Sequence, residues 1–263
     1  MIVDILLSFL LQIALTLGVI LLYGFLIALC NKAFYANFGS KSKIVCYVTG
    51  FIGTPIHELS HALFCLLFGH KITEIKLFQI NSDDGTLGYV SHSYNKKNFY
   101  HRIGSFFIGI APIIVISSVL YLISLWLLPN MMNLIAQDFQ NISFSGGFKS
   151  ISKAFSNIFS VLLNYSGNVN FWIFIVIGIF LALHMTLSGA DIKNALGGLA
   201  FVLLIMLLLN IVFYFFNASA IYNFAILNIA AILNMILFLS FIISVIAVII
   251  SFTLKFTIGR KIF

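Results

Sequence analysis

Charged residues are scarce in this sequence. Only 8% of the 263 residues are charged, whereas soluble domains carry about 25%, and 62% are hydrophobic. Acids are scarcer than bases, since seven Asp and Glu stand against fourteen Lys and Arg, for a net charge of +7. These cations are scattered without a dense run, which argues against nucleic acid as a partner. The composition predicts an integral membrane protein that has the lipid bilayer around it.

Cysteine is also rare. The three cysteines, Cys30, Cys46 and Cys65, lie in apolar stretches and show no CxxC spacing. An odd number without such spacing argues against both a disulfide framework and a thiolate metal site. No segment has the composition of a soluble module, so we expect a single polytopic membrane domain over residues 1–263.

Long hydrophobic runs make up most of the chain. They predict about six transmembrane helices, at roughly 2–29, 44–69, 103–128, 169–190, 195–217 and 222–253. The first run carries Asp4 where a signal peptide has cations, and it is too long for a signal h-region, so we expect it to be retained. Residues 129–168, rich in Ser, Asn and Phe, favour an interfacial helix or loop.

The most polar stretch is residues 70–102, with five of the cations and three of the acids. The side of the membrane that holds this loop and the C-terminus collects nine Lys and Arg, and the other side collects five. The positive-inside rule therefore predicts that both termini are cytoplasmic. Abundant Phe, Ile and Asn favour an AT-rich coding genome, and we expect a multi-pass protein of a bacterial cell membrane.

The same loop contains a hairpin signal. Asp84-Gly85 separates ITEIKLFQI from TLGYVSHSY, which predicts a membrane-associated β-hairpin over residues 72–94. The edge of such a hairpin could pair with an extended peptide, although a plain surface hairpin explains the pattern equally well. We expect His92 and His101, in the polar loop, to be solvated. The expected fold class is thus an all-α integral membrane protein with a β-hairpin between the second and third spans.

One motif carries chemistry. In GTPIHELSHALFCLLFG, residues 53–69, the residues His57, Glu58 and His61 form HExxH inside the second span. Because four residues are about one helical turn, the two imidazoles project from one face and can bind one Zn²⁺, with Glu58 placed as a general base. An accidental pair of core histidines would not explain a glutamate where charge costs at least ~2.5 kcal/mol.

A catalytic zinc needs a third protein ligand, and Asp191 is the first candidate. It lies in LHMTLSGADIKNALGG, residues 183–198, where His184, Ser188 and Asp191 share one face if the segment is helical. The second and fourth spans run the same way, so both motifs can lie at one depth. Alternatively, Asp191 caps the turn before the fifth span, and His184 is a ligand, a packing residue or a partner that holds a ligand.

Together these segments resemble the site-2-protease-like family of intramembrane zinc metalloproteases. The resemblance rests on HELSHA at 57–62, LGYV at 87–90, IGIAPI at 108–113 and an Asp near the end of the fourth span. It implies a metalloprotease core over residues 44–200, made of the HExxH span, the hairpin 72–94 and the third and fourth spans. Residues 1–43 and 201–263 would then be accessory transmembrane helices.

The resemblance also implies roles for individual residues. Zinc would be held by His57, His61 and Asp191, and Glu58 would be the general base. Gly88, Tyr89 and Val90 would be part of the strand that binds the substrate. The family usually carries its aspartate in an LDG tripeptide, whereas this chain has SGADI.

The expected function is hydrolysis of a peptide bond within or next to a membrane-embedded protein or peptide. Two alternatives stay open. One is a catalytically inactive membrane adaptor of the same fold. The other is a proton or cation carrier that uses the intramembrane His, Glu and Asp side chains.

Overall fold

The computed structural model describes residues 2–82, 85–140 and 147–262. These residues are mostly helical, and the sheet among them has two antiparallel strands. The elements in chain order are α1 (Ile2–Ile13), η1 (Ala14–Gly18), α2 (Val19–Ala36), η2 (Gly39–Lys41), α3 (Ser42–Leu67), β1 (Lys71–Lys76), β2 (Tyr89–Ser93), α4 (Phe99–Leu127), α5 (Pro129–Gln140), α6 (Gly147–Tyr165), α7 (Val169–Ala182), α8 (Gly189–Phe215) and α9 (Ser219–Ile262).

Local chemistry explains where the helices next to the site begin and end. The side chains of Asn98, Asn168 and Ser188 each accept a hydrogen bond from a backbone N–H of the first turn, at the starts of α4, α7 and α8. Such N-caps satisfy donors that have no partner within the helix. After α3, Gly69 adopts φ +69°, which turns the chain into β1.

Within the described residues, four helices are long and apolar enough to cross a membrane: Ile2–Ala36, α4, α8 and Ser219–Thr257 of α9. The expected second span is the helix α3, which falls outside this group because the polar HExxH residues lower its hydropathy. The expected fourth span is also interrupted, because α7 has 14 residues and passes only together with Ser156–Tyr165, across a bend of 114°. A membrane protein of helices is therefore supported, but the count of six spans is not.

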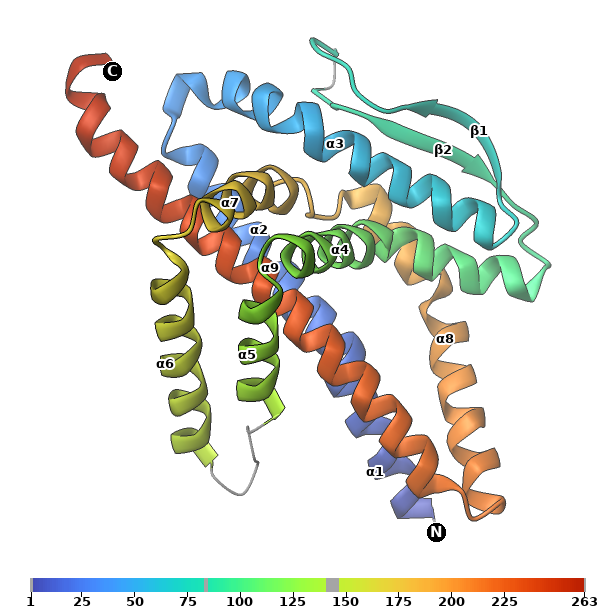
Figure 1. The fold of residues 1–263 in the computed structure, drawn as a ribbon. Coiled ribbons are helices and arrows are strands. Elements are labelled where there is room, and N and C mark those ends of the chain that lie inside the picture. The colour runs from blue at the N-terminus through green and yellow to red at the C-terminus, as the bar shows by residue number, and fades with distance from the viewer. Residues whose placement is uncertain (1, 83–84, 141–146, 263) are drawn as a thin grey trace.

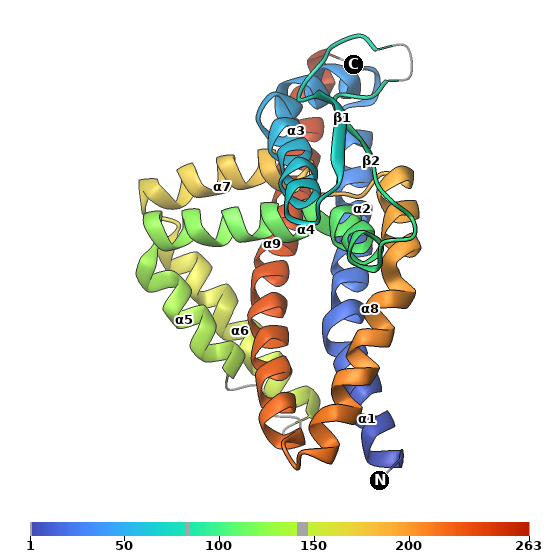
Figure 2. The ribbon, with the colours of Figure 1, turned by 90° about the vertical axis from the view of Figure 1, so that its right-hand side faces the viewer.

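The first and last long helices run in the same direction, side by side (Figures 1 and 2). Hydrogen bonds of amide side chains show that the two helices are parallel, because the residue numbers of the partners increase together along both. Asn223 donates to Ser8, Asn234 to the Leu15 carbonyl, and Asn37 to Ser251. The start of α1 and the end of α9 consequently lie at opposite ends of the molecule (Figures 1 and 2).

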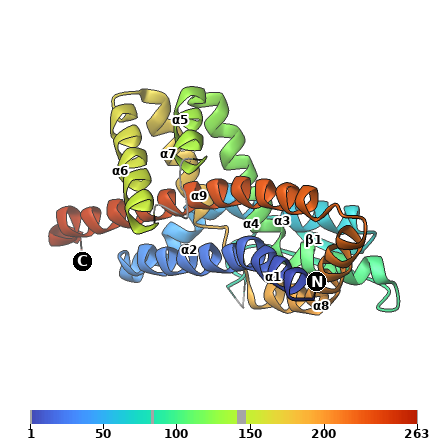
Figure 3. The ribbon, with the colours of Figure 1, turned by 90° about the horizontal axis from the view of Figure 1, so that it is seen from below.

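Helix α4 occupies the centre of the fold. It packs against α3 and α8 and runs across α9 rather than along it (Figure 2). Its side chains Ile108, Ile113, Ile116 and Leu120 are almost fully buried. Helices α5 and α6 lie side by side and project away from α8 and α9 (Figures 1 and 3). Residues 129–140 and 147–165 of the expected interfacial segment are therefore helical.

The predicted hairpin is present. Strand β1 pairs with β2 from Lys71 opposite Ser93 to Lys76 opposite Tyr89, with an irregularity between Ile72 and Glu74. The sheet lies along α3 (Figure 1). Asp84 of the expected turn lies outside the described residues, whereas Gly85 has φ +76°.

Candidate metal centre

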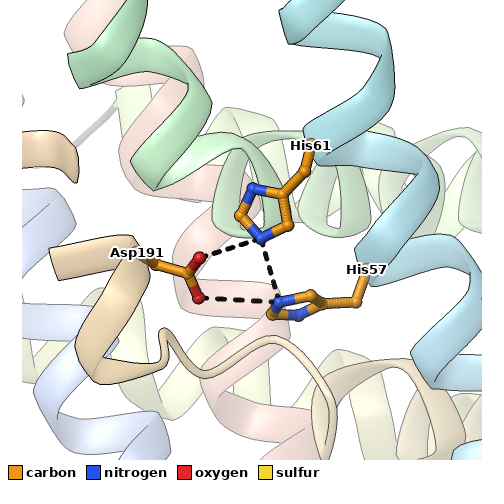
Figure 4. Close-up of side chains that lie close together, drawn as sticks. All are labelled: His57, His61 and Asp191. Carbon is orange, nitrogen blue, oxygen red and sulfur yellow. Dashed lines mark hydrogen bonds and ion pairs between the residues drawn. The ribbon is translucent and has the colours of Figure 1, made fainter. Parts of the chain in front are cut away.

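The two imidazoles of the HExxH motif face the same point. On α3, the Nε2 atoms of His57 and His61 are 3.2 Å apart (Figure 4). The Nδ1 atom of His57 donates to the carbonyl oxygen of His184 at 2.7 Å, and that of His61 donates to the carbonyl oxygen of Ile108 at 2.8 Å. Because carbonyls only accept, each Nδ1 carries a proton, and in the neutral imidazole each Nε2 then presents a lone pair.

Asp191 completes this group from another helix. Its Oδ1 is 3.1 Å from Nε2 of His61, and its Oδ2 is 3.7 Å from Nε2 of His57 (Figure 4). It does not lie at the end of a fourth span, as the sequence suggested, but in the first turn of α8. His184, Ser188 and Asp191 therefore do not share one helix, because α7 ends at Ala182 and the chain re-enters a helix only at Gly189.

The aspartate is also a cap. Its Oδ2 accepts a hydrogen bond from the backbone N–H of Ser188 at 2.7 Å, while the Ser188 hydroxyl accepts one from the backbone N–H of Asp191 at 3.2 Å. This reciprocal capping box fixes the side chain against its own helix start. Capping and approach to the two histidines, which looked like alternatives in the sequence, occur together.

Close contact between α4 and α8 sets the position of the aspartate. A Cβ atom on Gly109 would lie 2.4 Å from the carbonyl oxygen of Asp191 and 2.5 Å from the backbone nitrogen of Ala195. Only glycine fits at that distance. Since Ile108 is the next residue on α4, the same turn holds both the start of α8 and the imidazole of His61.

The donor set fits a zinc ion. Two imidazole lone pairs at 3.2 Å repel each other unless a proton or a cation lies between them, and both Nδ1 protons are already committed to carbonyls. A divalent cation removes this repulsion, and two imidazoles with one carboxylate are a typical zinc donor set that leaves one position open. Among the described residues, His57, His61 and Asp191 are the group whose ligand atoms all lie within 4.8 Å of one another.

Glu58 lies beside this group and is 6% exposed. The hairpin reaches it, because a Cβ atom on Gly88 would lie 2.9 Å from Cγ of Glu58. Tyr89 and Val90, the other expected substrate residues, lie further along β2 opposite Lys76 and Ile75, and the Tyr89 hydroxyl donates to the carboxylate of Glu74.

The side chain of His184 is not part of the group that could hold a metal ion. Its Nε2 lies 3.0 Å from the hydroxyl of Thr49 and 3.4 Å from that of Tyr35, and its Nδ1 lies 3.3 Å from the hydroxyl of Thr54. Both ring nitrogens thus have partners on α2 and α3. The part of His184 that reaches the metal centre is its backbone carbonyl.

The sequence predicted that His92 and His101 are solvated, but both are partly buried. They lie at the base of the hairpin with His70, whose Nδ1 is 3.1 Å from Nδ1 of His92 and whose Nε2 donates to the carbonyl of His101 at 2.8 Å. Burial and the neighbouring His70 and His61 lower the pKa of His92 to about 4. Burial also lowers the pKa of His70.

Some residues that shape the centre could not be found from the sequence. The carbonyls of Ile108 and His184 leave no trace in side-chain identity. The capping box of Ser188 and Asp191 does have a signal, namely a serine three residues before an acid.

Comparison with known proteins gives one family. Residues 50–147 match the model of a family described as "Putative zincin peptidase". The searches of curated proteins and of solved structures gave no match. The matched segment contains the HExxH motif, the hairpin and α4, but it ends before Asp191. The match supports a zinc metallopeptidase, with Zn²⁺ as its metal, and Asp191, which lies outside the matched segment, is brought to the two histidines by the tertiary structure.

Proposed function

We propose that this protein is an intramembrane zinc metalloprotease of the site-2-protease-like kind, which hydrolyses a peptide bond within or next to a membrane-embedded segment of a protein or peptide. The observation that carries the proposal is the convergence of three side chains from two helices. His57, His61 and Asp191 would hold the zinc ion, and Glu58 follows the first of them on α3.

In the proposed reaction, separate residues orient the metal ligands and transfer the proton. Hydrogen bonds to the carbonyls of His184 and Ile108 hold the two imidazoles in the tautomer that can bind metal. Zinc, when bound, supplies a Lewis acid that polarises a peptide carbonyl and lowers the pKa of water. Glu58 accepts the proton of the attacking water and returns it to the leaving amine, so that the peptide bond breaks with balanced protons.

The hairpin is suited to hold an extended substrate. Each described strand has one partner strand, and we propose that an extended peptide pairs with the sheet at its other edge. Gly88 lies against Glu58, and a peptide paired with this end of the hairpin would pass close to the general base. Strand addition would also satisfy the backbone groups of an unwound segment, which lipid cannot do. Gly88, Tyr89 and Val90 form the proposed contact.

An apolar cavity supports a substrate that comes from the membrane. It has a volume of about 370 Å³ and is lined by apolar side chains of η1, α2, α4 and α8, and of the segment before α8. Two of its lining residues, Leu187 and Ile192, lie on either side of Ser188 and Asp191. The helical segment Ile2–Ala36 and helix α8 are both candidate membrane spans. The cavity between them therefore suits the hydrophobic part of a transmembrane segment.

The test separates metal binding from chemistry. Glu58→Gln removes the base and keeps a side chain of similar shape, so we expect zinc content equal to wild type and a loss of turnover of at least about 100-fold. Purified protein is assayed for zinc, and cells that express each form are compared for membrane-protein fragments. Fragments that appear with wild type and not with Glu58→Gln are the products.

Other outcomes identify the alternatives. Zinc at one equivalent with no fragment dependent on Glu58 would indicate an inactive adaptor. No zinc, together with proton or cation flux in liposomes, would indicate a carrier and contradict the proposed function.

A further inference from the structure

The segment between α7 and α8, residues 183–188, contacts both halves of the metal centre. The carbonyl of His184 accepts the hydrogen bond from Nδ1 of His57, and Ser188 caps Asp191. A shift of this segment would therefore move one histidine and the aspartate together. What holds the segment in place decides how well the metal site is formed.

Two helices, α2 and α3, hold it. Asn31 on α2 donates to the carbonyl of Leu183 at 3.0 Å. The ring of His184 lies against α3, where a Cβ atom on Gly53 would be 2.6 Å from its Cδ2. The hydroxyls of Thr49 and Thr54, on residues that are 4% and 5% exposed, face its two ring nitrogens.

The hydrogen-bond directions in this group can be assigned. The single hydroxyl proton of Thr49 goes to the carbonyl of Val45 at 3.0 Å, as is usual for threonine within a helix. The oxygen of Thr49 is then left to accept from Nε2–H of His184, and Nδ1 accepts from the hydroxyl of Thr54. His184 is thus a neutral imidazole in which both nitrogens are used.

We propose that His184 is a positioning residue for the metal centre, whose side chain is anchored by Thr49 and Thr54 so that its carbonyl orients the imidazole of His57. The inference rests on the proposed function, because it assigns a role toward the same site. Thr49 is the informative position for a test. Within the described part of the chain its hydroxyl contacts His184, Tyr35 and carbonyls of its own helix, and no residue of the HExxH motif or the Asp191 cap.

The experiment compares Thr49→Val, which keeps the shape and removes the hydroxyl, with Thr49→Ser, which keeps the hydroxyl. The dissociation constant for Zn²⁺ is measured on purified protein by competition with a chelator. We expect Thr49→Val to bind zinc about 10-fold more weakly and Thr49→Ser to stay within about twofold of wild type, since partners of zinc-bound histidines typically contribute 10- to 100-fold. Thr253→Val is the control, because the hydroxyl of Thr253, an exposed residue of α9, donates to the carbonyl of Ile250 on its own helix.

A second readout requires neither metal nor substrate. In metal-free protein labelled with ¹⁵N-histidine, the Nδ1–H signal of His57 reports its bond to the carbonyl of His184. We expect it in wild type and in Thr49→Ser, and we expect it to be exchange-broadened or lost in Thr49→Val. If wild type binds no zinc, the proposed function fails, and this signal alone then decides the positioning role.

The inference is overturned if Thr49→Val keeps both the zinc affinity and the Nδ1–H signal of wild type. It is equally overturned if Thr49→Val only lowers the melting temperature of the metal-free protein, because the threonine would then serve the stability of the fold and not the orientation of His57. The double variant Thr49→Val/His184→Phe should bind zinc no more weakly than His184→Phe alone, since the two residues act in series.

Discussion

Each of the two histidines in the HExxH motif uses one ring nitrogen in a hydrogen bond to the fold and directs the other toward the group that could hold a metal ion. The Nδ1 protons are directed to carbonyls of α4 and of the segment after α7. Asp191 likewise uses Oδ2 to cap its helix while Oδ1 lies nearest to His61. These double roles mean that substitution of a single residue changes both zinc affinity and local structure.

Asp191→Ala tests the third side chain of the centre. We expect the zinc affinity to fall by at least about 100-fold, because two imidazoles alone give an incomplete donor set, and the start of α8 to lose about 1 kcal/mol from its cap. Zinc content after dialysis and thermal unfolding measure the two effects.

Asp138→Ala is the control for that substitution. Asp138 is a partly buried aspartate of α5 that accepts a hydrogen bond from Asn157. Its zinc content should equal that of wild type. Full zinc content in Asp191→Ala would show that Asp191 is a cap and nothing more.

Among the elements, the contact between α4 and α8 brings the two halves of the centre together. Gly109→Ala would place a methyl group at 2.4 Å and 2.5 Å from backbone atoms of α8, which cannot rotate away as a side chain can. We expect α8 to shift, the free energy of unfolding to fall by about 1–3 kcal/mol and zinc affinity to fall with it.

Gly197→Ala is the matched control on α8, because nothing lies within 4 Å of a Cβ atom there. This variant should bind zinc as wild type does and be equal or slightly higher in stability, since alanine favours a helix. Equal zinc affinity in the two glycine variants would contradict the role of the α4–α8 contact.

The base of the hairpin depends on neutral histidines. Since Nε2 of His70 donates to a carbonyl, its Nδ1 accepts from Nδ1–H of His92, while Nε2 of His92 faces the amide of Asn194 on α8 at 3.5 Å. A proton added to His70 would set two N–H groups against each other. The hairpin is thus held to α3, α4 and α8 by a chain of bonds that requires both rings to be uncharged.

Low pH should destabilise this end of the hairpin. The pKa of His92 is lowered from 6.5 to about 4, so between these pH values the unfolded chain binds more protons than the folded one. The stability of the hairpin should be constant above pH 6.5 and fall as the pH drops toward 4. Hydrogen exchange of the amides of β1 and β2, measured on metal-free protein, reports this stability.

His92→Gln should flatten the pH dependence, because the amide keeps a donor and an acceptor but does not titrate in this range. If the exchange rates of the variant and of wild type change equally with pH, His92 is not the group that responds to acid.

At the scale of the whole molecule, the parallel course of the first and last long helices bears on topology. Both Ile2–Ala36 and Ser219–Thr257 are candidate spans, and the hydrogen bonds of their amide side chains show that the two helices run parallel. Two spans that cross a membrane in the same direction begin on one side and end on the other. The chain ends should therefore lie on opposite sides, in contrast to the even number of spans and the two cytoplasmic termini expected from the sequence.

Reporter fusions test this topology. A reporter that is active only in the cytoplasm and one that is active only outside it are joined to either end of the full chain, and we expect opposite results at the two ends. The same result at both ends would support six crossings, with α3 and α7 as full spans, and would contradict the arrangement inferred from the helix contacts.

The sequence was sufficient for what depends on spacing along the chain. The apolar runs predicted the helices, the strand pattern predicted the hairpin, and the four-residue interval in HExxH placed His57 and His61 on one face of α3. These features are local, since the period of a helix or a strand decides which side chains lie together. Asp191 was a candidate because the second and fourth apolar runs were expected to cross the membrane in the same direction, which allows both motifs to lie at one depth.

Only the tertiary structure decided how these pieces combine. It placed the carboxylate of Asp191, and not the imidazole of His184, beside His57 and His61, because α7 stops at Ala182 and the imidazole of His184 is turned toward Thr49 and Thr54. It also set the carbonyls that fix each tautomer, the burial of His92 and the parallel first and last helices. Backbone carbonyls carry no mark of residue type, and contacts between segments more than a hundred residues apart depend on packing, which no local pattern contains.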